Sequence, residues 1–202
     1  IEDALRKEGF SLSVIPLKTS DMGTLDVVVE EIKAGHDFIV FNLCEGAFGK
    51  SYLEMHVAAL FELYGARFTG SGPLTLGLSL DKGLTKDILS AGGVPTAGYR
   101  IMAERDARFN PGLKFPLIVK PVHEDASIGI GPGSVVNTIE ELRERVGFVT
   151  SKFGQPAIVE EYIDGREFNV AVFGNGAEAR AFPVSEIEFV DFPPGSPKIC
   201  CY

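Results

Sequence analysis

The sequence predicts an α/β protein whose first part is built on a parallel sheet. The apolar segments 10–17 and 37–43 have the length and composition of strands, and the amphipathic segment TLDVVVEEIKAG lies between them and ends at Gly35. A second amphipathic segment, KSYLEMHVAALFELYG, follows and ends at Gly65. Strands and helices that alternate in this order are typical of a parallel sheet.

The second part of the chain has a different pattern. A loop, TGSGPLTLGLSL, leads into an expected helix, DKGLTKDILSAGG, and strands are expected at 98–103 and 115–121. Thr138, with Glu141 three residues later, forms a capping box that predicts the start of another helix. After residue 155 the segments PAIVEEYI, REFNVAVFG and EARAFPVSEIEFV all have strand character, which indicates antiparallel pairing.

This change of pattern predicts a domain boundary near residues 74–80, which gives domains 1–77 and 78–202. Both ends of the sequence are expected to be truncated. IEDALRKEGFSLSVIPL has the pattern of the last turns of a helix, a stop at Gly9 and a strand, and DFPPGSPKICCY stops in a loop.

The composition excludes two classes of partner. No apolar run approaches the roughly 20 residues that cross a bilayer, so no membrane association is expected. The net charge of −9 argues against a nucleic-acid partner, because phosphate backbones require an excess of lysine and arginine. Cys44, Cys200 and Cys201 are odd in number and lack metal-ligand spacing, which favours a reducing, cytoplasmic location.

In the segment FPLIVKPVHEDASIGI, residues 115–130, an expected apolar strand is followed by a charged residue. Lys120 follows the buried-type run FPLIV and precedes a loop of small residues that includes Gly129. One interpretation is that the ammonium group holds an anion while the loop closes over it. The other is that a strand end simply extends its lysine to solvent.

Three segments in order resemble the ATP-grasp enzymes of the D-alanine–D-alanine ligase type. They are TGSGPLTLGLSLDKGLTKDILSAGGVPTAGY, FPLIVKP with HEDASIGI, and PAIVEEYIDGREFNVAVFG. The resemblance implies a parallel-sheet N-terminal (preATP-grasp) domain over 1–77, followed by ATP-grasp α+β subdomains. These are a central subdomain over 78–155 and the start of a C-terminal subdomain over 156–202.

The same resemblance implies which residues bind ATP. Lys82 and Lys120 match lysines that face the phosphates, and the loop with Glu124 and Ser127 matches the flap that covers the triphosphate. The segment between the subdomains meets the adenine edge, and a following carboxylate holds the ribose hydroxyls. The matching residues are Glu160, Glu161, Tyr162 and Ile163 for adenine and Glu167 for ribose.

The substrate side departs from the family pattern. In the loop NLCEGAFGKS, Glu45 is expected to meet a substrate amino group, with an exposed glutamate at a strand end as the alternative. Ser127 is the flap serine assigned to catalysis, while Asp125 and Ala126 replace a glycine and a serine of the family. These replacements put specificity for D-alanine in doubt.

The implied activity is ATP-dependent joining of an amino-acid carboxylate to an amine through an acyl phosphate. Mg²⁺ would bridge the phosphates, with ligands expected beyond Tyr202, and the resemblance leaves a homodimer open. Two alternatives remain: an ATP-grasp ligase for another carboxylate and amine pair, and a non-catalytic ATP-binding relative.

Overall fold

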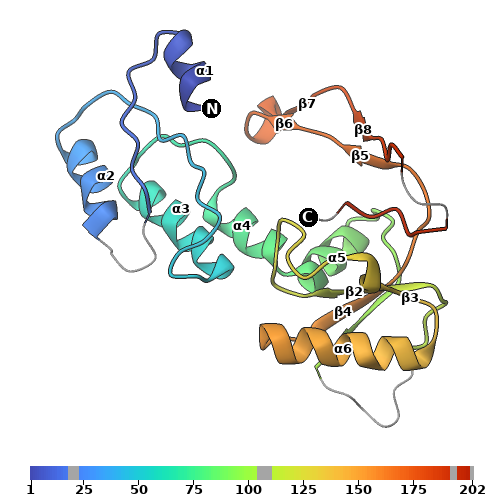
Figure 1. The fold of residues 1–202 in the computed structure, drawn as a ribbon. Coiled ribbons are helices and arrows are strands. Elements are labelled where there is room, and N and C mark those ends of the chain that lie inside the picture. Colours follow the sequence, from blue (N-terminus) through green and yellow to red (C-terminus); the bar gives the residue numbers. More distant parts are fainter. Residues whose placement is uncertain (18–22, 104–110, 192–194, 201–202) are drawn as a thin grey trace. The chain divides into compact units, whose positions relative to one another are not determined.

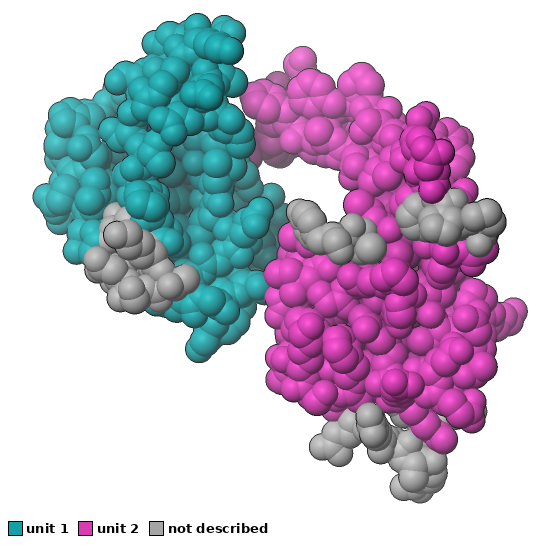
Figure 2. Space-filling view, in the orientation of Figure 1, with its two compact units in different colours: residues 1–85 teal, residues 86–202 magenta. Residues whose placement is uncertain are grey.

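The computed structural model describes residues 1–17, 23–103, 111–191 and 195–200, so Cys201 and Tyr202 lie outside the described residues. The chain forms two compact units, residues 1–85 and 86–202, which are coloured separately in Figure 2. The domain limits expected from the sequence stay a prediction. Among the helices of the described residues, none has both the length and the apolar character needed to cross a membrane.

Unit 2 is organised around a four-stranded antiparallel sheet (Figure 1). Its strands lie in the order β1 (Tyr99–Met102), β4 (Ala157–Glu161), β2 (Leu117–Pro121) and β3 (Val135–Val136). Val119 on β2 is paired with Val159 on β4, and Tyr99 on β1 with Glu160 on β4. The strands expected at 98–103 and 115–121 are confirmed.

Helix α6 (Ile139–Phe153) covers one face of this sheet, as Figure 1 shows. It begins after Thr138, whose Oγ1 accepts the Glu141 N–H at 3.2 Å, so the expected start is confirmed. It ends at Gly154 in the left-handed conformation. Its apolar residues recur at helical spacing and close the core of the unit with residues of β2, β3 and β4: Leu142, Val146 and Val149 pack with Leu117, Val119, Val136, Ala157 and Val159.

The rest of unit 2 contains short antiparallel pairs. β5 (Glu167–Asn169) pairs with β8 (Ser185–Ile187), and β6 (Val172–Phe173) pairs with β7 (Arg180–Ala181). Two single-turn 3₁₀ helices, η2 (Pro132–Ser134) and η3 (Gly176–Glu178), lie in the connections. The antiparallel character expected after residue 155 is confirmed, in shorter strands than the sequence pattern indicates.

Unit 1 is mainly helical in its described residues. Its elements are α1 (Glu2–Lys7), α2 (Gly23–Lys33), η1 (Ser51–Leu53), α3 (Glu54–Leu63) and α4 (Pro73–Leu80), and α5 (Lys82–Ala91) begins in it. The core joins α2 and α3 through Val28, Val57 and Phe61, and the Phe61 and Phe68 rings lie 5.6 Å apart between centroids. The helices expected around residues 24–35 and 50–65 are confirmed.

Two expectations for unit 1 were wrong. Segments 10–17 and 37–43 form no strand, because an extended segment needs a hydrogen-bonded neighbour and the only bridge described there joins Val40 to Phe68 in parallel. The segment TGSGPLTLGLSL, expected as a loop, contains α4, with Gly72 as its N-cap and Pro73 in the first turn. Proline is favoured there because the first helical N–H groups have no partner within the helix.

Candidate functional site

A pair of opposite charges lies on the sheet face that α6 leaves uncovered. Side chains alternate along a strand, so Lys120 and Glu160 lie opposite Val119 and Val159, which pack against α6. Lys120 is directly paired with Ile158, which makes Glu160 its diagonal neighbour on the same face. The Lys120 ammonium forms an ion pair with Glu160 Oε2.

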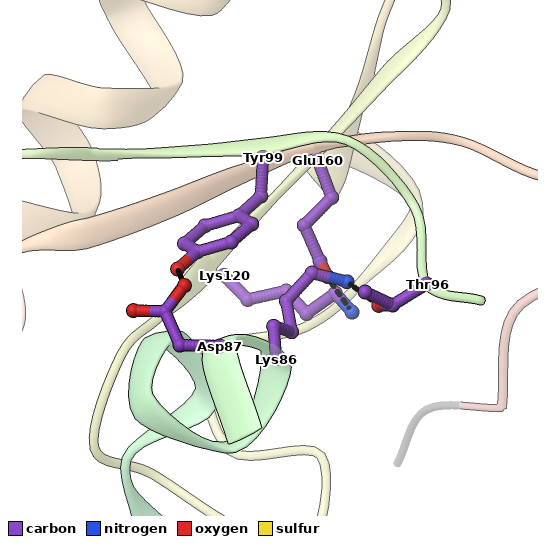
Figure 3. A network of polar contacts seen from close by, with 6 residues as sticks. All are labelled: Lys86, Asp87, Thr96, Tyr99, Lys120 and Glu160. Atoms are coloured by element: carbon purple, nitrogen blue, oxygen red, sulfur yellow. Dashed lines mark hydrogen bonds and ion pairs between the residues drawn. The ribbon is translucent and has the colours of Figure 1, made fainter. Parts of the chain in front are cut away.

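A second lysine binds the other oxygen of the same carboxylate (Figure 3). Lys86 on α5 places Nζ 2.7 Å from Glu160 Oε1 and donates a hydrogen bond to Thr96 Oγ1 at 2.5 Å. The ammonium also lies 5.6 Å from the centroid of the Tyr99 ring. Tyr99 donates its hydroxyl to Asp87 Oδ1 at 2.5 Å. Both carboxylate oxygens are therefore held, by lysines from two elements.

The environment keeps the Glu160 carboxyl ionised. Burial favours the neutral form, but attraction to Lys120 and hydrogen bonds from both lysines outweigh it, so the pKa of Glu160 lies below its ordinary value. Two ammonium groups flank the Glu160 carboxylate and leave one positive charge in excess at that carboxylate, while the Asp87 carboxylate of the same network accepts the Tyr99 hydroxyl. Lys86 is only 8% exposed, so its charge is largely shielded from water, whereas the Lys120 side chain is 23% exposed. The arrangement can attract an anion even though the chain carries a net charge of −9.

The loop that follows β2 has a defined backbone turn. Ala126 and Ser127 both take the left-handed conformation, with φ of +48° and +61°, which is unfavourable for residues with a side chain. The Asp125 carboxylate accepts the Ala126 N–H at 2.8 Å, and its carbonyl accepts the Ile128 N–H at 2.9 Å. Ser127 Oγ donates to the carbonyl of Cys200 at 3.0 Å.

Residues of α6 and of the segment just after it anchor both ends of this loop. Gln155, just after the helix, accepts the His123 N–H at 2.6 Å through Oε1 and donates to Glu124 Oε1 at 2.8 Å through Nε2. Within the helix, Arg145 Nη2 donates to the Gly129 carbonyl at 2.5 Å. The same nitrogen donates to Ser134 Oγ at 2.7 Å. The residues on both sides of the turn at 125–128 are therefore held by hydrogen bonds.

The residues after Glu160 that were expected to bind adenine and ribose have different contacts and different exposures. Glu161 Oε1 accepts the Lys114 N–H at 3.1 Å. Tyr162 donates its N–H to the Pro116 carbonyl at 2.9 Å and its hydroxyl to the Lys198 carbonyl at 3.1 Å. The Ile163 side chain is 71% exposed, and Glu167 is exposed at the start of β5. The structure brings only Glu160 of this expected set together with Lys120.

Two further expected residues lie in unit 1. Lys82 is the first residue of α5, and Glu45 is exposed in the turn after Cys44. That turn is shaped by Asn42, whose Oδ1 accepts the Cys44 N–H at 3.1 Å and whose N–H donates to Thr69 Oγ1 at 3.0 Å. The roles of Lys82 and Glu45 toward the charges in unit 2 stay predictions.

Sequence reasoning missed Lys86. In DKGLTKD it follows Lys82 by four residues, which places both lysines on one face of a helix and is the only signal the sequence offers.

The ligands of a metal ion were expected beyond Tyr202. Across the described residues, no three His, Cys, Asp or Glu side chains gather in a way that could hold a metal ion.

Several known proteins resemble this chain in sequence and in fold. Residues 88–192 match the family described as D-ala D-ala ligase C-terminus. The uncharacterised protein y4sG of Sinorhizobium fredii is 43% identical over 150 residues, which are 74% of this chain and 43% of that protein. The D-alanine–D-alanine ligase of Bordetella pertussis is 34% identical over 156 residues, which are 72% of this chain and 48% of the ligase.

A solved structure agrees with these matches. The crystal structure of the D-alanine–D-alanine ligase of Helicobacter pylori has a TM-score of 0.57 and 26% identity, over 81% of this chain and 49% of that chain. The chain thus spans about half the length of the curated relatives it matches. Among the described residues, the matched part includes Lys120, Glu160 and the loop between Glu124 and Gly129.

Proposed function

The chain belongs to the D-Ala–D-Ala ligase family of ATP-grasp proteins, and on that premise we propose that it binds ATP and takes part in joining an amino-acid carboxylate to an amine. The relatives named D-alanine–D-alanine ligase support D-alanine as the first substrate to test. The finer fold follows the same premise: unit 1 would be the parallel-sheet domain, which the parallel bridge between Val40 and Phe68 supports.

The observation that carries the proposal is the pair of lysines around Glu160. A nucleotide triphosphate brings several negative charges, and the side chain of Lys120 is 23% exposed. Each charge-assisted hydrogen bond to a phosphate oxygen contributes about 1.5–3 kcal/mol. Glu160, kept ionised, accepts hydrogen bonds and so suits the amino group at the adenine edge.

The loop contributes in a second way. Its small residues Ala126, Ser127 and Gly129 allow backbone N–H groups to approach phosphate oxygens closely. Because Gln155 and Arg145 fix its two ends, the loop would meet the phosphates with little loss of conformational entropy. These residues bind and orient. In the reaction that follows, a carboxylate attacks the γ-phosphate and displaces ADP, and an amine then attacks the resulting acyl phosphate, loses a proton and displaces phosphate.

Magnesium is the metal that the family resemblance implies. Among the described residues no three His, Cys, Asp or Glu side chains gather to hold a metal ion, and no residue of this part of the chain is assigned as a magnesium ligand. Among this chain's own groups, Lys82, Lys120 and the backbone N–H groups of the loop are the ones proposed to contact the phosphates.

A second candidate function is a ligase for a different pair of substrates. Asp125 stands where the family has a glycine, and its carboxylate is committed to the Ala126 N–H. Ala126 cannot supply the hydroxyl of the serine it replaces. The flap differs from the family pattern while the expected ATP-binding residues follow it. We expect this combination in a ligase that uses ATP but joins a different carboxylate or amine.

The test combines binding and turnover. Calorimetry with ATP should give measurable affinity for the wild type, and Lys120→Met should weaken it roughly 10- to 100-fold, the loss of one charge-assisted contact. Lys33→Met, which changes an exposed lysine that forms an ion pair with Glu30 on α2, is the matched control and should leave affinity unchanged. Phosphate release by the full-length protein with D- and L-amino acids then identifies the substrates. A wild type that binds no ATP contradicts the proposal.

A further inference from the structure

The two lysines that share Glu160 are held to very different degrees. Lys86 has three partners: Glu160 Oε1 at 2.7 Å, Thr96 Oγ1 at 2.5 Å and the Tyr99 ring at 5.6 Å. For Lys120, the contacts of its ammonium among the described residues are with Glu160 alone. The side chain of Lys120 is also about twice as exposed, at 23% against 11%.

Lys86 is fixed from several elements. Thr96 lies in the connection that follows α5, and Tyr99 lies on β1, where its backbone is paired with Glu160. Tyr99 is itself held by the bond from its hydroxyl to Asp87, one residue after Lys86 on α5 (Figure 3). Lys86 and Glu160 therefore belong to a rigid frame, while Lys120 attaches to it by one ion pair.

Release of either lysine leaves the other as the counter-ion of a buried carboxylate. Glu160 is 7% exposed, and an unpaired charge at such a position is strongly disfavoured. With Lys86 in place, Lys120 can leave Glu160 without that penalty. Without Lys86, Lys120 has to stay.

We propose that Lys86 is a positioning residue that holds Glu160 ionised and in place, so that Lys120 is free to exchange its carboxylate partner for a phosphate oxygen of the bound nucleotide. This inference rests on the proposed function. The exchange moves an ammonium group from one oxygen to another: the hydrogen bond to Glu160 Oε2 breaks, one to phosphate forms, and no proton is transferred. Lys86 itself touches neither phosphate nor substrate.

The test compares a ligand with phosphates to one without. By calorimetry, Lys86→Met should weaken ATP binding roughly 10- to 100-fold, because Lys120 is then retained by Glu160. Adenosine, which has no phosphate for Lys120 to reach, should lose less than about threefold. Lys86→Arg, which keeps a cation beside the carboxylate, should recover most of the ATP affinity. A merely structural role for Lys86 would weaken both ligands equally.

A double-mutant cycle gives the second readout. In Glu160→Gln the carboxylate that retains Lys120 is gone, so adding Lys86→Met should cost ATP binding less than about threefold. Thr96→Val keeps all three charges and loosens only Lys86, so it should lower ATP affinity and spare adenosine even if Lys86→Met fails to fold. Lys33→Met again serves as the control for loss of a lysine.

The outcomes separate the two proposals. A wild type that binds no ATP overturns the proposed function. A wild type that binds ATP while Lys86→Met or Thr96→Val binds it equally well overturns the role of Lys86 alone. The role of Lys86 is also overturned if Lys86→Met weakens the binding of ATP and of adenosine equally. It is overturned as well if Lys86→Met weakens ATP binding as much in the Glu160→Gln background as in the wild type.

Discussion

Substitution of Gly129 by alanine should destabilise unit 2 because the loop passes through a space without room for a methyl group. A Cβ at this position would lie 2.7 Å from Pro121 Cγ and 2.8 Å from Phe153 Cζ. Pro121 is buried at the end of β2, and Phe153 is the last residue of α6. The glycine also has φ of +77°, in the left-handed region.

The expected cost has two parts. A residue with a Cβ in the left-handed conformation costs about 1–2 kcal/mol. Overpacking between a strand end and a helix end costs about 1–3 kcal/mol more, because buried Pro121 cannot rotate away and Phe153 packs against the core. Together the loss in the free energy of unfolding should be about 2–5 kcal/mol, a large share of the 5–15 kcal/mol typical of a folded domain.

Two other glycines separate these contributions. Gly154 has φ of +63° and no neighbouring atom within 4 Å of the place that a Cβ would take, so Gly154→Ala should cost only the conformational part, about 1–2 kcal/mol. Gly131 is extended, with φ of −168°, and is equally open, so Gly131→Ala should stay within about 0.5 kcal/mol. Urea denaturation followed by circular dichroism measures all three. If Gly129→Ala is no less stable than Gly154→Ala, the packing explanation is wrong.

Two further predictions concern the core and the charged group. Leu142→Ala, in the fully buried centre of α6, should lower the free energy of unfolding by about 2–5 kcal/mol in urea, whereas Leu63→Ala, at a side chain 84% exposed, should change it by less than about 0.5 kcal/mol. The folded-state pKa of Glu160 is lowered, so its contribution to stability is present above its ordinary value of 4.5 and is lost as the pH falls through the folded pKa. The stability difference between wild type and Glu160→Gln should therefore shrink from pH 7 to pH 3 in urea titrations, and a constant difference would contradict the assignment of the charge.

The parts of the fold that the sequence predicted are those with strong local signals. Helix α6 has a side-chain cap at Thr138, apolar residues at helical spacing and a glycine at its end, and all three signals agree. The run FPLIV predicted β2 because apolar residues of this kind suit a strand buried on both faces. Local signals suffice when the segment's own chemistry determines its conformation.

Other segments depended on distant partners. The apolar segments 10–17 and 37–43 predicted strands, but no ladder is described for either, since pairing requires a second strand at hydrogen-bonding distance. The segment that contains α4 was expected to be a loop. Proline in the first turn in fact suits a helix start, so the chemistry was present and was misinterpreted.

The candidate site shows the same division between local and distant information. Lys120 and Glu160 were predicted from the resemblance, each on its own segment, yet nothing in the sequence indicates that they contact each other. Their contact follows from the register of β2 against β4, which places Lys120 beside Ile158 and so beside the residue two positions on. Lys86 could not be predicted as buried, because its burial comes from Thr96, Tyr99 and Glu160 together.

The charge of the whole chain is a poor guide to the charge of this site. A net charge of −9 sets the long-range potential, which salt screens over about 8–10 Å. Two lysines and one carboxylate that are shielded from water act at a few ångströms, where the effective dielectric constant is lower and each interaction is stronger. An acidic protein can therefore bind an acidic nucleotide, provided that its lysines are gathered by the fold and their carboxylate neighbour is already neutralised by one of them. The second lysine matters for this reason, because with Lys120 alone the Glu160 carboxylate would neutralise the charge that is proposed to bind phosphate.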